Sequence, residues 1–365
     1  MQLFKFNPLT DPTVLESGET INGATSIMWV ERYLEPGEFE IVAPLSVGMK
    51  SFLPLGTLIS HTGTLEVMIV ENHEIKETNA EDPVLTITGR TFDSYLSNRI
   101  VGVDDARLGP AIGEIGLDIG SVSNQIAMLI GFYITDGIAD DNLVNVVPRY
   151  EFESETVSSR TVKPGPLDVR VRELLVIDDL GIKTVRRNNF ELAPGNELET
   201  WLYIYRGKDK TREVIFSWLG GDIEQAEYLY TIKNLKTSAL VMGKWAQVIV
   251  DGPQTGYNRR FMLVDASDLD DKLDAIPTGT ELTALLDKMR VRGNEALQSQ
   301  TRIHLTQADA SNVTRYRYRI DFNVGDIVRL EGNYGEITNM RVTEYTEIQD
   351  ENGETGHPTL QLPGV

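Results

Sequence analysis

The sequence predicts a mainly β protein with mixed α+β insertions, organised in two to four domains. Three observations lead to this prediction. The chain has 365 residues, which is too long for one ordinary hydrophobic core. β-Branched and aromatic residues alternate with polar ones between residues 27 and 103, and again after Trp201. Helical periodicity is limited to a few stretches that follow or interrupt these strand-like regions.

The first strand-like region is expected to form four to six strands joined by tight turns. Its apolar runs cover residues 27–44, around a turn at 35–38, and then 55–61, 65–77 and 83–89. The last run leads into 90–100, where Thr91 is expected to cap a short helix. Strands at this spacing, closed by one helix, indicate a small barrel or sandwich.

The next region, 104–200, changes character and is interpreted as a mixed α+β insertion. A Gly-rich loop at 109–121 precedes a helix with one apolar face, and the polar stretch 150–166 reads as extended. A second helix is expected over 167–181, with Asp168 as its cap and Gly181 as its left-handed end. The apolar faces of these helices consist of Ile126, Leu129, Ile130, Tyr133 and Ile134 in the first, and Val171, Leu174 and Leu175 in the second.

Strands return after Trp201 and are joined by the longest helix of the chain. Strand-like runs occupy 201–207, 213–218, 226–234, 238–250 and 259–266. The helix covers about 278–300, with capping-box spacing between Thr278 and Glu281 and an inward stripe of Leu282, Leu285, Leu286 and Met289. A Gly-punctuated ribbon follows at 321–355, with turns at 332–335 and at Asn352-Gly353.

Composition excludes several classes of function. The chain has 34 basic and 55 acidic residues, a formal net charge of −21, and such a field repels nucleic-acid phosphate. Cysteine is absent, which excludes disulfides, thiol nucleophiles, thiolate zinc sites and iron–sulfur clusters. The N-terminus lacks the pattern of a signal peptide and no apolar run is long enough for a membrane span, so we expect synthesis and folding in a cytoplasm.

No combination of residues indicates catalysis, a cofactor or a metal site. The histidines, His61, His73, His304 and His357, are far apart and show no HExxH spacing, and no Walker loop, nucleophile elbow or dinucleotide fingerprint occurs. The acidic stretch 265–274 lacks the central Gly and closing Glu of a calcium loop, so a solvated linker is the better interpretation. The carboxylate pairs Asp140-Asp141 and Asp178-Asp179 carry no glycosidase signature. The four tryptophans, Trp29, Trp201, Trp218 and Trp245, are interpreted as packing residues.

Several stretches, in this order, resemble the tail-hub or baseplate-hub (minor tail) proteins of siphophages that infect actinobacteria, with a fold shared by the central hub of contractile tails. They are residues 32–44, 56–71, 85–101, 198–243, 286–297 and 321–360, which together span nearly the whole chain. The resemblance implies two tube-like β-barrel domains decorated by mixed α/β domains. It also implies a homotrimer whose six barrels dock beneath a hexameric tail tube.

The resemblance assigns the parts of the chain as follows. Residues 1–103 form the first barrel, 104–200 the α+β insertion, and 201–234 connecting strands that can complete the first barrel. Residues 235–365 form the second barrel, with the helix at about 278–300 inserted and discontinuous domains allowed. Subunit-interface residues are not assigned.

The resemblance also implies a role. The protein is expected in the virion at the tail tip, between the distal tail protein above and other tip proteins or a central fibre below. The tape measure protein and DNA are expected in the lumen, where an acidic lining would keep DNA from sticking during ejection. Two other functions stay open on the residues alone: a cell-wall-binding, adhesin-like module, and a hydrolase of the tail tip.

Overall fold

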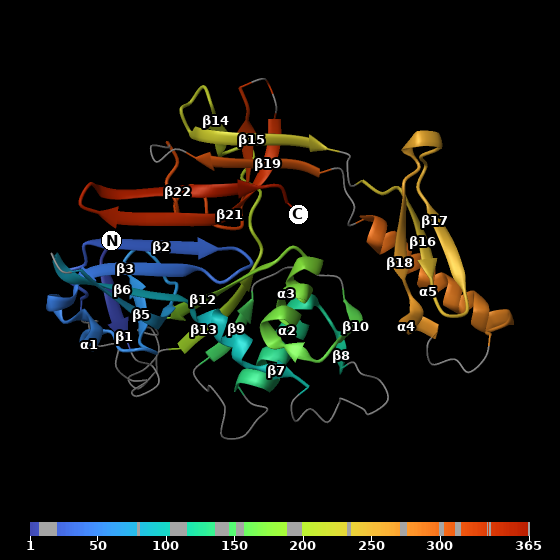
Figure 1. Cartoon of the computed structure of the whole chain (residues 1–365), viewed down its shortest axis with the longest axis horizontal. Helices are drawn as coiled ribbons and strands as arrows, with labels where there is room; N and C mark the ends of the chain where they lie inside the picture. Colours follow the sequence, from blue (N-terminus) through green and yellow to red (C-terminus); the bar gives the residue numbers. More distant parts are fainter. Residues whose placement is uncertain are drawn as a thin grey trace. The chain divides into compact units, whose positions relative to one another are not determined.

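The computed structural model divides into two compact units, which are described separately. Unit 1 consists of Met1–Ala226 and Gln307–Val365, and unit 2 consists of Glu227–Thr306. The structure describes residues 1–6, 20–78, 81–102, 115–135, 146–150, 157–187, 199–231, 235–270, 276–298, 303–310, 315–333, 335 and 337–363. Strands dominate (Figure 1), so the prediction of a mainly β fold with helical insertions is confirmed.

A 12-stranded sheet forms the framework and joins both ends of the chain. Its order is β1-β4-β5-β6-β3-β2-β21-β22-β19-β15, with β20 paired to β21 and β14 paired to β20. The strands are β1 (Leu3–Phe6), β2 (Ser26–Arg32), β3 (Glu38–Pro44), β4 (Leu58–His61), β5 (Met68–Thr78), β6 (Glu81–Thr91), β14 (Ile215–Ser217), β15 (Ile223–Thr231), β19 (Ile303–Ala310), β20 (Ile327–Glu331), β21 (Ile337–Asp350) and β22 (Gly353–Gln361).

The central contact of this sheet joins the predicted N-terminal strands to the predicted C-terminal ribbon. β2 pairs antiparallel with β21, with Trp29 opposite Glu347 and Glu31 opposite Tyr345. β21 and β22 form the expected hairpin, with Asp350 opposite Gly353 at its tip. Among the described strands the main path of the sheet ends at β1 and β15, the branch through β20 ends at β14, and the sheet does not close into a barrel.

The alternation of apolar and polar residues that predicted the first strands also explains which of their side chains form the core. β3 buries every second residue, and its inward Phe39 and Ile41 pack with Trp29 and Ile87 of the neighbouring strands. Two elements escaped the sequence analysis: β1, which pairs with β4, and a one-turn helix α1 (Met49–Phe52), preceded by a 3-10 turn at Leu45–Val47.

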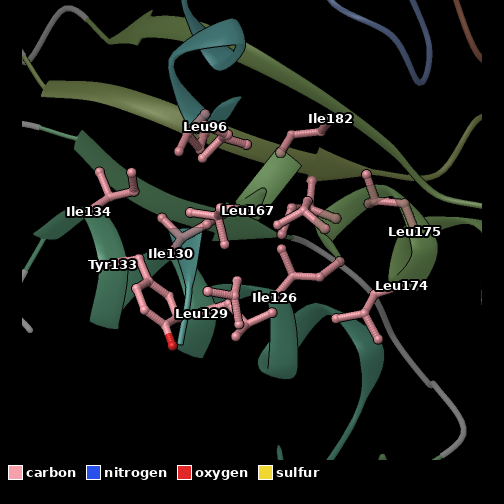
Figure 2. Packing of buried hydrophobic residues seen from close by; sticks show 14 of the residues in the cluster. Leu96, Ile126, Leu129, Ile130, Tyr133, Ile134, Leu167, Leu174, Leu175 and Ile182 are labelled. Atoms are coloured by element: carbon pink, nitrogen blue, oxygen red, sulfur yellow. The ribbon is translucent and has the colours of Figure 1, made fainter. Parts of the chain in front are cut away.

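The α+β insertion of unit 1 has a core of its own, shown in Figure 2. Its elements are a 3-10 helix (Phe92–Asn98), β7 (Ile100–Val101), β8 (Ile115–Gly120), α2 (Val122–Ile130) continued by a π-helical turn (Gly131–Thr135), β9 (Val146–Tyr150), β10 (Ser158–Val162), β11 (Gly165–Pro166), α3 (Leu167–Ile177), β12 (Gly181–Arg187) and β13 (Glu199–Tyr205). The sheet order β12-β13-β9 presents Ile182, Leu202 and Ile204 to the two helices. Both predicted apolar helix faces are buried, which confirms them.

Three predicted helix caps differ in the structure. Thr91 makes no side-chain cap on the following helix, because its hydroxyl accepts a hydrogen bond from the Gly37 N–H (2.9 Å). Pro166, not Asp168, is the N-cap of α3. Asp179 takes the left-handed conformation at the end of that helix (φ 55°), while Gly181 begins β12 and faces Tyr33, where a Cβ atom would lie 2.4 Å from the ring.

Unit 2 is a three-stranded sheet covered by the long helix. Its elements are β16 (Ser238–Met242), β17 (Gln247–Asp251), a 3-10 turn (Gly256–Asn258), β18 (Phe261–Asp265), α4 (Ser267–Asp270) and α5 (Gly279–Gln298), with sheet order β17-β16-β18. Leu285 and Met289 of α5 pack on Ala239, Val241 and Val250, as the predicted stripe requires. The predicted single run 238–250 is two strands, because the chain turns at residues 243–246.

Candidate functional site: a buried charge cluster and its pocket

Unit 1 contains a cluster of buried and half-buried polar and charged side chains on one face of the β2–β21 pair. Glu31 of β2 and Glu347 of β21 share this face, since Trp29 lies opposite Glu347 and Glu31 lies opposite Tyr345. Glu31 is only 3% exposed. A carboxylate is buried at low cost only when cations or hydrogen-bond donors compensate it. We call Glu31, His61, Tyr318, Arg319 and Glu347 the charge cluster.

Arg319 joins the two carboxylates. Its guanidinium donates to Glu31 Oε1 (2.7 Å) and to Glu347 Oε1 (2.8 Å). Arg319 adopts φ 64°, a left-handed conformation that costs an ordinary residue energy and that persists where surrounding contacts fix it. The segment before β20 is therefore held against β2 and β21 by one side chain.

Tyr318 and His61 complete the cluster. The Tyr318 hydroxyl donates to Glu31, and its ring stacks on Tyr345 with centroids 3.8 Å apart. His61 Nδ1 accepts a hydrogen bond from the Gly63 N–H (3.0 Å), which leaves Nε2 as the protonated nitrogen, 3.3 Å from Glu347 Oε2. Four separate chain segments therefore meet at these side chains.

The pKa values of the two carboxylates in the charge cluster are shifted by the groups that pair with them. Burial favours the neutral form of Glu31, but the charges of Arg319 and Lys183 and the hydrogen bonds from Tyr318 and Thr64 outweigh it and lower the pKa. The pKa of Glu347 is lowered as well, because His61 and Arg319 outweigh its burial. Both carboxylates are thus ionised and engaged, which suits a positioning role rather than proton transfer.

A pocket of about 720 Å³ opens beside the cluster. Its lining includes Glu31 and Tyr318 from the cluster, Glu66 from the turn before β5, and Lys183, Trp201 and Tyr203 from one face of the β12–β13 pair. The register Lys183 opposite Tyr203 explains why these strands present alternate residues to the pocket. The residues between them, Ile182 and Leu202, point to the core of the insertion.

Glu66 differs from the other carboxyl groups of this region. Burial and the neighbouring Glu31 raise its pKa well above the ordinary range. Its closest cation is Lys183, whose Nζ lies 4.0 Å from Oε1, beyond hydrogen-bond distance. The pocket therefore contains one buried carboxyl group that is incompletely paired.

A second ion pair, between the buried Arg341 and the exposed Asp179 carboxylate, fixes the end of α3 to the main sheet. Arg341 of β21 pairs with the Asp179 carboxylate and donates from Nη1 to the Gly325 carbonyl oxygen (2.7 Å). The Tyr33 hydroxyl donates to the Asp179 carbonyl oxygen (2.7 Å). Of the acidic pairs considered in the sequence, Asp178-Asp179 is thus structural, and Asp140-Asp141 lies outside the described residues.

The histidines considered in the sequence do not come together. His61 is in the charge cluster, His73 Nε2 lies 2.7 Å from the Leu53 carbonyl oxygen, and His357 is in β22. His304 is in β19, and its side chain lies outside the described part. Within the described residues no group of three or more His, Asp or Glu side chains is placed to hold a metal ion.

The remaining candidates are distributed over both units. Residues 109–114 of the Gly-rich loop and residues 271–274 of the acidic stretch lie outside the described residues, whereas residues 115–120, also predicted as loop, form strand β8. Asp270 is buried and accepts hydrogen bonds from the Lys244 and Trp245 N–H groups (both 2.8 Å), so it closes a turn of unit 2. Trp29 is fully buried, as expected for a packing residue, whereas Trp201 lines the pocket. No helix in the described part of the chain is long and apolar enough to cross a membrane.

The sequence analysis missed the charge cluster, although one signal was present. Ile27, Trp29 and Glu31 occupy alternate positions of β2, so the pattern places Glu31 on the buried face. A charged residue at such a position requires a buried partner. Arg319 carried no comparable signal, because it lies in an irregular segment 288 residues away.

Comparison with known proteins agrees with the resemblance found in the sequence. The family model of siphovirus ReqiPepy6 Gp37-like proteins matches residues 9–108 and 139–360. No curated protein sequence matches the chain significantly.

Solved structures of phage tail proteins share the fold over its full length. A tail protein from Neisseria meningitidis MC58 is 12% identical with a TM-score of 0.57, and the match covers 100% of this chain and 97% of that one. The 43 kDa tail protein of prophage MuSo2 from Shewanella oneidensis is 12% identical with a TM-score of 0.58 and coverages of 100% and 98%. Prophage tail protein gp18 from Listeria monocytogenes EGD-e is 10% identical with a TM-score of 0.54 and coverages of 99% and 94%. Because the family model matches most of the chain, the chain belongs to the family of siphovirus ReqiPepy6 Gp37-like proteins.

Proposed function

We propose that the protein is a structural subunit of a siphophage tail tip, in which three copies form a hub ring below the tail tube. The observation that supports this most directly is the combination of a siphovirus family match over most of the chain with a full-length fold match to phage tail proteins. The ring adapts the sixfold tube and distal tail protein to the tip and surrounds the channel for the tape measure protein and DNA.

The proposed ring uses two tube-like units per subunit. In this proposal residues 1–103, with 201–234, form one such unit and residues 235–365 contribute the other, with 104–200 as a decorating insertion. The β2–β21 pairing supports a close association of the two ends of the chain.

The proposed role is assembly and gating without bond-making chemistry. The net charge of −21 supports a channel wall or outer surface that does not retain DNA, so no specific nucleic-acid binding is proposed. The paired state of Glu31 and Glu347 supports a structural use of these two carboxylates. Other tip proteins or a central fibre bind below the ring.

Cryo-electron microscopy of the virion, with this chain tagged, tests the proposal. We expect density for three copies around the tail axis at the tip, and a trimer by light scattering at high protein concentration. Density on the outside of the tip with six or more independent copies would instead support the cell-wall-binding alternative. Clearing of host peptidoglycan in a zymogram would show that the protein is a hydrolase and would refute the structural role.

A further inference from the structure

The pocket beside the charge cluster contains a carboxyl group that is incompletely paired. Glu66 is 3% exposed, and Lys183 Nζ lies 4.0 Å from its Oε1, beyond hydrogen-bond distance. The backbone of Glu66 is engaged: its N–H donates to Thr64 Oγ1 (3.1 Å) and its carbonyl oxygen accepts from Ser60 Oγ (2.6 Å). The turn thus fixes Glu66, which lines the pocket, in place.

The cations near Glu66 are already in use. Arg319 is shared between Glu31 and Glu347, and Lys183 acts on both Glu31 and Glu66 from 4.0 Å or more. Burial, and then the charges of Glu31 and Asp93, raise the pKa of Glu66 well above the ordinary range, while Lys183 and Arg319 act in the opposite direction. A cation in direct contact with the Glu66 carboxyl group would favour its ionised form.

Arg186 also lines the pocket but does not supply that cation. Its Nε donates to Ser60 Oγ (3.2 Å) and its Nη2 donates to the Thr64 carbonyl oxygen (3.1 Å), both neutral acceptors. Its guanidinium lies over the Phe4 ring, 4.8 Å from the centroid. Burial lowers its pKa, and the charges that act on Glu66 are those of Glu31, Lys183, Asp93 and Arg319.

The walls of the pocket suit a cationic group with an alkyl stem. Trp201, Tyr203 and Tyr318 line it, and aromatic faces attract ammonium and guanidinium groups. Its volume of about 720 Å³ is in the range of pockets that enclose small ligands. The net charge of −21 would also accelerate the approach of a basic partner.

We propose that this pocket binds a Lys or Arg side chain of a neighbouring tail protein, with its cationic group paired to Glu66 and its stem against Trp201 and Tyr203. The partner is thus a protein with an exposed basic residue on a projecting segment. The proposal goes beyond the hub role and does not depend on the number of copies in the ring.

Blocked tripeptides test the proposal on the full-length protein. Acetyl-Gly-Arg-Gly-amide is titrated by calorimetry against the citrulline tripeptide, a neutral isostere, and the Glu tripeptide. We expect the Arg tripeptide to bind about tenfold more tightly than the citrulline tripeptide, since hydrogen bonds to a charged group contribute of this order. Glu66→Gln should remove this preference. Glu74→Gln, on an exposed carboxylate of β5, should keep it.

The pH dependence provides a second readout. Because the pKa of Glu66 is raised, a bound cation must displace its proton, so affinity for the Arg tripeptide should rise with pH in wild type and stay constant in Glu66→Gln. Equal affinities for the Arg and citrulline tripeptides would overturn the proposal, as would the absence of binding. Tighter binding of the Glu tripeptide would show that the pocket recognises an anion through Arg186 and would also overturn it.

Discussion

The substitution Arg319→Met gives the most direct test of the charge cluster. It removes the donors to Glu31 (2.7 Å) and Glu347 (2.8 and 3.2 Å) while the methylene stem is kept. Glu31 retains its hydrogen bonds from Thr64 and Tyr318 but loses its main cation. Breaking a buried ion pair by removing one partner costs about 3 to 5 kcal/mol, so we expect unfolding of unit 1 to become easier by about this amount at pH 7.

The matched control is Arg90→Met in the same sheet. Arg90 makes an equally good two-pronged contact with Glu71 (both 2.7 Å), but the two side chains are 48% and 32% exposed. An exposed pair contributes below about 1 kcal/mol. Denaturant unfolding followed by circular dichroism compares the two variants. Equal losses of stability in both would refute the argument that burial makes the Arg319 contacts important.

The pH dependence of the free energy of unfolding is a further test of the electrostatic explanation. The pKa values of Glu31 and Glu347 are lowered in the folded protein, so their pairing stabilises the fold above the pKa of the unfolded chain and this contribution is lost as pH falls through the folded values. Arg319→Met should therefore be much less destabilising near pH 3 than at pH 7. A loss of stability that is the same at both values would contradict the electrostatic explanation.

Three further predictions concern other parts of the chain. Burial raises the pKa of Asp93 to about 6, so stability is lost as pH rises from about 4 to 6. Asp93→Asn should remove this loss and stabilise the protein at pH 8 by about 2 kcal/mol in thermal unfolding. Gly207→Ala should destabilise unit 1 by more than about 2 kcal/mol, because its Cβ would lie 1.7 Å from the Gly325 carbonyl oxygen; a soluble variant with unchanged denaturant midpoint would refute this. Met289→Ala should cost about 2 to 5 kcal/mol in unit 2, and hydrogen exchange should increase in β16 and β17 but not in β5 and β6.

Local pattern was sufficient to predict most individual elements. Period-2 alternation located β2, β3, β5 and β6, and three of the four predicted stripe residues of α5, Leu285, Leu286 and Met289, belong to the core of unit 2. The hairpin at Asn352-Gly353 was also predictable, because the turn residues themselves set the register of β21 and β22. These features are determined by residues close together in the sequence, so the spacing of apolar and turn residues is enough to predict them.

Caps and small elements were less predictable, since tertiary contacts compete for the same groups. Thr91 has a capping side chain, yet its hydroxyl accepts from Gly37 across the sheet. Gly181 has the flexibility for a left-handed helix end, yet Asp179 takes that conformation and is held there by Arg341 and Tyr33. Intrinsic preference is worth about 1 kcal/mol at such positions, so several tertiary hydrogen bonds acting together can override it.

The sequence alone established an acidic, cysteine-free, strand-rich chain, and the alternation in β2 held an unused signal that Glu31 is inward. It could not show that Arg319 would compensate that carboxylate, or that Glu66 would stay incompletely paired beside Trp201 and Tyr203. Strand periodicity is encoded between adjacent residues, whereas the pairing of buried charges depends on which distant segments the completed sheet brings within about 3 Å of each other.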